Sequence, residues 1–303
     1  DAASGYHLWA ERYDRELQDI FELQDEVTQK IVSALAVKLT ESEQQRLRRP
    51  PTENVQAYDY FLRGLECYFR RTKEANLQAR QMFEQAIQLD PQFATAYAYL
   101  GRTHLTDLAF QWSQDPGSLE HVFTLGQQAV ALDDSQPTAH ETLAYAYIGK
   151  KQHAEAIAEA QKAVALDPNS ADAYATLGEV LSFAGQAEDG LPFIEKAVRL
   201  NPRYPIPYLW ALSYASYLTG RTHAAMEIAK RILSHNPDHP TAHVLLAVIY
   251  SELDRMPEAQ AEAAEILRIS PHYSLAVMKQ NMPQKDQASL RRYIEGLRKA
   301  GLE

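Results

Sequence analysis

Three histidines in the last third of the chain have a spacing that could hold a metal ion. His235, His239 and His243 recur every four residues, which on one continuous helix would place three imidazoles on the same face. Three such imidazoles suit a Zn²⁺ site with an open fourth position. Pro237 and Pro240 interrupt the stretch, however, and proline breaks a helix interior. We therefore expect no metal site, and we assign these histidines to packing and to the surface.

The single cysteine, Cys67, is the other side chain with reactive chemistry. No histidine lies close to it in sequence to activate a thiolate, and one thiol excludes an internal disulfide. The chain has neither a glycine-rich phosphate loop nor a nucleophile elbow. We therefore predict a buried structural thiol, no catalytic residues and no cofactor.

The composition excludes some classes of function. The net charge is −10 and the pI is about 5.5, whereas proteins that bind nucleic acid or anionic membranes are normally basic. No apolar run approaches the roughly 18 to 20 residues that cross a bilayer, and the chain shows no signal peptide. We expect a cytoplasmic protein. Because the chain begins at Asp1 without Met, we also expect it to be part of a longer protein.

A proline recurs near the end of alanine-rich amphipathic segments, and its last four copies are spaced 34, 35 and 34 residues apart. Such a period indicates an array of helical hairpins. The segment 171–204 shows one unit clearly, with Ser170 as the expected N-cap of its first helix. Small residues, Gly178 in the first helix and Gly190 and Ala197 in the second, predict a close approach of the two helices.

These units resemble the tetratricopeptide repeat (TPR) family, whose pattern is an aromatic residue, Leu-Gly, an aromatic residue, and later Ala, an aromatic residue, Ala and Pro. The resemblance implies an all-α, right-handed solenoid of six repeats at 57–93, 94–136, 137–170, 171–204, 205–239 and 240–273. Against a 34-residue unit, we place a three-residue insert in the first hairpin turn. Nine more residues fall around Ala109 to Gly117, and one lies in repeat 5.

The two ends depart from the repeat. Residues 1–49 predict a short strand from Tyr6 to Tyr13 and then a helix of nearly thirty residues from about Asp19, joined to the repeats by a linker at 50–56. Residues 274–303 predict a capping helix that ends at Gly301. Its apolar face consists of Leu290, Tyr293, Ile294 and Leu297.

The segment from His7 to Leu39 resembles the join between a TolB-like domain and a TPR array, and Leu290 to Leu302 resembles the terminus of the same proteins. This architecture occurs in bacterial class III adenylate/guanylate cyclases with a TPR tail. The resemblance implies a non-catalytic regulatory tail, because the cyclase metal-binding aspartates and nucleotide pocket are not in this sequence. Similar tails follow winged-helix transcription regulators, so a sensing or dimerisation tail is the alternative.

In the resembled family, the first helix of each hairpin lines a concave groove. The register places there Tyr58, Phe61, Tyr68, Arg102, Glu141, Tyr145, Glu179, Trp210, Tyr214 and Tyr217. This set lacks the Lys/Asn carboxylate clamp of chaperone-binding TPR domains. Aromatic and acidic positions suit a peptide with apolar anchors and a basic residue. The partner would be a protein or peptide, or upstream domains of the same polypeptide, with the oligomeric state open. Alternatively, the aromatic residues pack on the opposite wall or on the cap.

Overall fold

The computed structural model describes residues 20–34, 51–113, 115 and 117–303. Over these ranges it contains 15 helices and no strand. The first is α1, Ile20–Ala34, which covers the described part of the predicted long helix. The predicted strand from Tyr6 to Tyr13, the rest of the long helix and the start of the linker lie outside the described residues.

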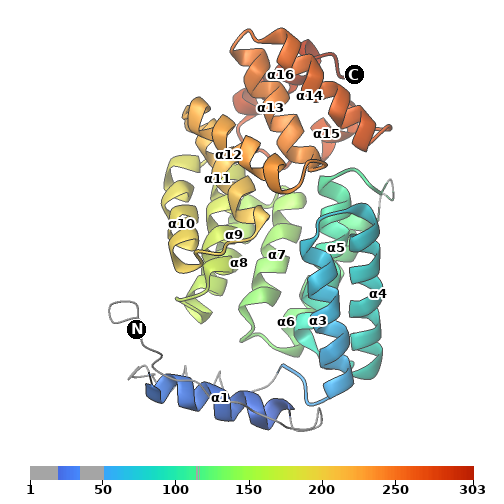
Figure 1. Cartoon of the computed structure of the whole chain (residues 1–303), viewed down its shortest axis with the longest axis vertical. Helices are drawn as coiled ribbons and strands as arrows, with labels where there is room; N and C mark the ends of the chain where they lie inside the picture. The colour runs from blue at the N-terminus through green and yellow to red at the C-terminus, as the bar shows by residue number, and fades with distance from the viewer. Residues whose placement is uncertain (1–19, 35–50, 114, 116) are drawn as a thin grey trace.

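Twelve helices form six consecutive hairpins, and two more follow them (Figure 1). The helix pairs are α3 (Val55–Phe69) and α4 (Lys73–Leu89), α5 (Ala94–Ala109) and α6 (Ser118–Leu132), α7 (Pro137–Gly149) and α8 (His153–Leu166), α9 (Ala171–Phe183) and α10 (Ala187–Leu200), α11 (Ile206–Leu218) and α12 (Thr222–His235), and α13 (Pro240–Glu252) and α14 (Met256–Ile269). The last two helices are α15 (Leu275–Asn281) and α16 (Gln287–Lys299). Each of the twelve hairpin helices packs on its neighbours in sequence within the array, and α5, α7, α9 and α11 also pack on one another in that order. The predicted all-α solenoid is therefore confirmed.

Local capping determines where several helices begin. Ser170 accepts a hydrogen bond from the amide of Ala173 at 3.1 Å, which confirms it as the N-cap of α9. Asn54 caps α3 in the same way by accepting bonds from two backbone amides. Such caps satisfy amides that have no partner within the helix.

Every hairpin turn contains one residue in the left-handed backbone region. The position is glycine in repeats 4 and 5, where Gly185 and Gly220 have φ of 80° and 76°. The other four turns use Arg71, Gln111, Lys151 and Asp254, with φ between 52° and 61°. A side chain in this region costs backbone energy, so these four turns carry strain that a glycine would not.

The two helices of repeat 4 approach as closely as their small residues predict. A Cβ atom built on Gly190 would lie 2.5 Å from the carbonyl oxygen of Gly178, and Ala197 is fully buried. Only glycine permits this backbone contact. The predicted close approach is confirmed.

The insert predicted for the first hairpin turn is wrong. The turn between α3 and α4 spans residues 70–72, the same length as the turn between α7 and α8 at 150–152. The extra residues lengthen α4 instead, which has 17 residues where α10 has 14. In the second hairpin the extra residues do lie around Ala109 to Gly117, because α6 begins only at Ser118. We call residues 110–117 the repeat-2 insert.

Candidate functional site

The residues predicted for the groove lie on the first helices of the hairpins, and several meet across neighbouring repeats. Glu141 of α7 meets Arg102 of α5, and Glu179 of α9 meets Tyr145 of α7. Because these contacts join successive first helices, the side chains share one surface, which we call the inner face.

In repeat 1 the predicted lining is part of the hydrophobic core. Phe61 is 5% exposed, and its ring lies 5.7 Å from Phe83 and 4.9 Å from Phe93. Tyr58 packs on Phe61 with ring centroids 6.5 Å apart, and Tyr68 is also buried. Phe61 and Tyr68 are thus held in place by α4 and α5 and offer little surface to a partner.

Arg102 and Glu141 form a buried ion pair. The Arg102 guanidinium bonds the Glu141 carboxylate, donates to Thr142 Oγ1 at 3.1 Å, and lies 5.1 Å above the ring of Tyr99. Burial alone would lower the pKa of Arg102, but the nearby Glu141 carboxylate and tyrosine rings raise it above its ordinary value. The arginine therefore stays charged, and the pair joins repeats 2 and 3.

Glu179 is a second carboxylate of the inner face. It is half-buried, and its Oε2 accepts a hydrogen bond from Tyr145 Oη at 2.7 Å. Burial raises the pKa of the Glu179 carboxyl, although bonding from Tyr145 and Trp210 and the charges of Arg71 and Arg102 act against this rise. Within the described ranges, no Lys or Arg nitrogen lies within 4.0 Å of this carboxylate.

Trp210 borders the same region and leads into a closed aromatic cluster. Its ring stacks on Tyr214 with centroids 5.5 Å apart and an interplanar angle of 15°. Trp210 itself is half-buried, whereas Tyr214 and Tyr217 are each 1% exposed.

The C-terminal segment covers Tyr214 and Tyr217. Tyr214 Oη donates to Gln284 Oε1 at 3.0 Å, and the Tyr293 ring lies 6.1 Å from Tyr214 and 5.8 Å from Tyr217. Arg292 donates to Tyr217 Oη at 3.1 Å. The expectation of an open lining at these two tyrosines is therefore corrected. In the structure, these two aromatic residues pack on the cap, which is the alternative that the sequence left open.

The cap itself has the face that its sequence predicts. Leu290, Tyr293, Ile294 and Leu297 are all buried. A Cβ atom on Gly296 would lie 3.2 Å from Val248 on α13, so α16 packs closely on the first helix of repeat 6. Helix α16 therefore fills the inner face of repeats 5 and 6 and leaves Tyr145, Glu179 and Trp210 as its partly accessible portion.

The three histidines spaced by four lie in three different environments. His235 is exposed and bonds the backbone oxygen of Arg231. His239 is buried, with its ring 5.2 Å from that of Phe110. His243 bonds Glu262. Within the described part of the chain, no group of three or more His, Cys, Asp or Glu side chains has an arrangement suited to a metal ion. Cys67, predicted to be buried, is half-buried beside Gln78.

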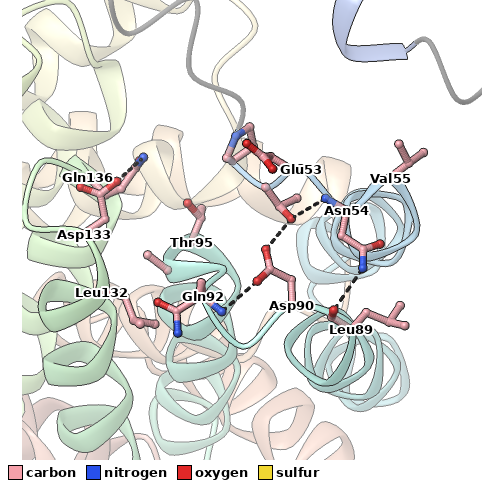
Figure 2. Close-up of a pocket in the computed structure, with 13 residues that line it drawn as sticks. Glu53, Asn54, Val55, Leu89, Asp90, Gln92, Thr95, Leu132, Asp133 and Gln136 are labelled. Carbon is pink, nitrogen blue, oxygen red and sulfur yellow. Dashed lines mark hydrogen bonds between the residues drawn. The ribbon is translucent and has the colours of Figure 1, made fainter.

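A hollow of about 840 Å³ lies at the edge of the first three repeats where α3, α5 and α7 begin (Figure 2). Figure 2 shows its polar side chains bonded to each other and to the backbone, as in the bond from the Gln92 amide to Asp90 Oδ1 at 2.9 Å. Asn54 likewise donates to the backbone oxygen of Leu89 at 3.1 Å. Sequence reasoning missed this hollow because its lining comes from loop residues without periodic pattern. Several of its polar groups, including Asn54, Asp90 and Gln136, are engaged in structural bonds, so the inner face is the better candidate.

Comparison with known families identifies part of the array. Residues 147–212 and 217–279 match the family described as tetratricopeptide repeat. The matched residues extend from α7 to α15 of the helical array. The repeats imply a protein-interaction scaffold, and the TPR fold is generally non-catalytic. No helix in the described ranges combines the length and apolar character that a membrane span requires.

A curated relative agrees with the resemblance to adenylate cyclase-type tails. Putative adenylate cyclase 3 of Rhizobium meliloti (strain 1021) is 40% identical over 157 residues, which are 52% of this chain and 27% of that protein. The chain thus matches about a quarter of the relative's length.

The chain resembles solved structures at low sequence identity. A chain in the crystal structure of the APC/C hetero-tetramer Cut9-Hcn1 matches with a TM-score of 0.53 and 15% identity. The match covers 87% of this chain and 54% of that chain. YrrB, described as a TPR protein with an unusual peptide-binding site, matches with a TM-score of 0.39 and 21% identity, over 63% of this chain and 93% of that one.

Proposed function

We propose that this chain is a non-catalytic scaffold that holds a peptide segment of a partner on the inner face of repeats 3 to 5. The observation that carries the proposal is the half-buried Glu179 carboxylate, which has hydrogen-bond donors beside it but no cation within ion-pair distance in the described residues. Burial of an ionised carboxylate is costly without a counter-ion. A basic side chain from a partner would remove that cost.

The neighbouring aromatic residue suits the same ligand. Trp210 presents an indole ring that accommodates the aliphatic stem of Lys or Arg, and its face attracts a cation. Tyr145 holds the Glu179 carboxylate through its hydroxyl. The segment recognised is therefore one with a basic residue next to apolar residues.

The similarity to putative adenylate cyclase 3 supports a regulatory setting for this scaffold. We propose that the array is the tail of a bacterial signalling protein and that its ligand is either another protein or an upstream domain of the same polypeptide. In both cases the tail would influence the output domain by holding that segment.

An immobilised array of random-sequence 15-residue peptides tests the proposal. Peptides bound by the chain should be enriched in Lys or Arg beside apolar residues. Glu179→Gln, which keeps the acceptor for Tyr145, should remove the enrichment and weaken binding at least tenfold. The matched control is Glu155→Gln, an exposed carboxylate on α8. Equal enrichment in the Glu179→Gln variant and the unaltered chain would refute the assignment.

A further inference from the structure

Turns at the start of the array touch loops at its end. Asn236 Nδ2, after α12, donates to the backbone oxygen of Arg71 in the first hairpin turn at 3.5 Å. The ring of Phe110 meets that of His239 edge-on at 5.2 Å. Figure 1 shows the same relationship, with the end of α5 beside the last hairpin and α15. The array therefore curves until its two ends meet.

The repeat-2 insert supplies most of this junction. The backbone oxygen of Phe110 accepts a bond from Ser270 Oγ at 3.5 Å, and the Gln111 side chain accepts one from the amide of Ser274 at 3.2 Å. Gln111 holds the left-handed position that every hairpin turn has, but the helix before this turn, α5, has 16 residues where α7 has 13. We call the contacts of Phe110 and Gln111 with His239, Ser270 and Ser274 the clasp.

The clasp borders the inner face. Arg71, next to it, is close enough for its charge to act against the raised pKa of Glu179. Burial lowers the pKa of His239 to about 3, and the Arg71 charge adds to this effect. The Arg71 guanidinium donates to Thr106 Oγ1 at 3.1 Å and to Tyr68 Oη at 3.0 Å, while the Arg71 Nε is buried and has no hydrogen-bond partner. Through its bond to Tyr68, Arg71 connects the junction to the inner face of repeat 1.

We propose that the clasp is a gate, and that release of Phe110 and Gln111 from His239, Ser270 and Ser274 opens the inner face to a partner segment. The nature of the segment that binds the opened inner face rests on the proposed function. The opening of the clasp does not depend on it. Release separates no pair of adjacent repeats, because the junction joins repeat 2 to repeats 5 and 6 and to the start of the capping segment.

The contacts of the clasp are suited to reversible release. They comprise one edge-on ring pair and hydrogen bonds of 3.2 to 3.5 Å, at the long end of the normal range. Adjacent repeats, in contrast, bury continuous apolar faces such as the cluster around Leu177, Val180 and Leu181. Phe110, 6% exposed, is the one buried apolar side chain among the five residues of the clasp, and elements with few buried apolar contacts open at lower free energy than the rest of a fold.

Acrylamide quenching of Trp210 fluorescence in the full chain tests the gate without any partner. The background carries Trp9→Phe and Trp112→Phe, so that Trp210 is the only emitter. Phe110→Ala combined with Gln111→Ala removes the clasp and should raise the quenching constant at least threefold. The matched control, Phe123→Ala, removes a ring from the same hairpin on α6 that packs on Tyr147 instead, and should leave quenching unchanged.

A locked form completes the test. Gln111→Cys and Ser274→Cys, in a Cys67→Ala background, are joined by a short bis-maleimide, which tolerates a wider range of separations than a disulfide. In the locked chain, acrylamide should quench Trp210 fluorescence no more than in the unlocked chain. The locked chain should also bind peptide-array ligands at least ten times more slowly. Equal quenching in the locked, intact and clasp-free forms would overturn the proposal. If Trp210 quenching rises on loss of the clasp but no peptide binds, the gate is retained and only the proposed ligand is rejected.

Discussion

His243 directs its Nδ1 to Glu262 Oε2 at 2.5 Å and its Nε2 to the backbone oxygen of Pro237 at 2.8 Å. A carbonyl oxygen only accepts, so Nε2 carries a hydrogen, and the carboxylate on the other side favours a second hydrogen on Nδ1. The ring is thus held as an imidazolium between α13, α14 and the preceding loop. This histidine, one of three with metal-site spacing, serves to join the two helices of repeat 6.

The same arrangement occurs in repeat 3. His140 Nδ1 lies 2.6 Å from Glu159 Oε2, and its Nε2 lies 2.9 Å from the backbone oxygen of Asp134. In both repeats the carboxylate stands 19 residues after the histidine. The pair is therefore a recurring way to tie a hairpin to the loop before it.

Loss of the carboxylate in repeat 6 should cost stability in a pH-dependent way. Burial alone would lower the pKa of His243, but the Glu262 and Pro237 bonds raise it above its ordinary value. The contribution is fully present below the unfolded pKa of about 6.5 and is lost as pH rises through the higher folded value. Glu262→Gln should destabilise the chain by about 2 kcal/mol at pH 6 and by less at pH 9. Urea unfolding measures this, with Glu155→Gln as the control, and an identical loss at both pH values would contradict the imidazolium assignment.

His239 should make the chain sensitive to acid. Burial, then the charges of Arg71 and His243, lower the pKa of its ring to about 3. Because the folded pKa is below the unfolded one, stability is fully present above about pH 6.5 and is lost as pH falls toward 3. The loss from His239 should reach about 3 kcal/mol by pH 4, at about 1.4 kcal/mol per pH unit. His239→Phe should flatten the dependence of unfolding free energy on pH, whereas His235→Phe, at an exposed position, should not. An unchanged slope in both variants would argue that His239 titrates normally.

The left-handed turn positions should respond oppositely to glycine and alanine. Lys151 and Asp254 have φ of 61° and 58° and are exposed, so Lys151→Gly and Asp254→Gly should each stabilise the chain by about 0.5 to 1 kcal/mol. Gly220→Ala should destabilise it by about 1 kcal/mol, and only through the backbone, since a Cβ there meets nothing within 4 Å. Arg71→Gly should not stabilise, because it also removes the bonds to Thr106 and Tyr68. Thermal melting of the four variants checks this, and a stabilising Gly220→Ala would contradict it.

The hairpins themselves were predictable because the signals for them are local. Ser170 caps its helix through bonds three residues away, and Gly178 and Gly190 meet across one turn. The error in the first hairpin has a physical reason as well. Three extra residues can lengthen a helix such as α4 without disturbing the apolar pattern on either side, so spacing alone did not distinguish a longer helix from a longer turn.

The candidate site was predictable only in part. Register placed Tyr145 and Glu179 on neighbouring first helices, and the structure brings them to 2.7 Å. Register did not reveal that Tyr214 is covered, because its cover includes Gln284, 70 residues further along the chain. Which of the predicted positions remain accessible depends on the path of the C-terminal segment.

The amino-acid sequence by itself determined the repeat, its helices and the face that each helix buries, since these depend on contacts within one unit and with the next. The tertiary structure alone decided that Ser270 reaches Phe110, 160 residues away, and that α16 lies on the inner face. The curvature of a solenoid is the sum of small rotations at every repeat interface. No single repeat specifies that sum, and so the meeting of the two ends is visible only when all the repeats are assembled.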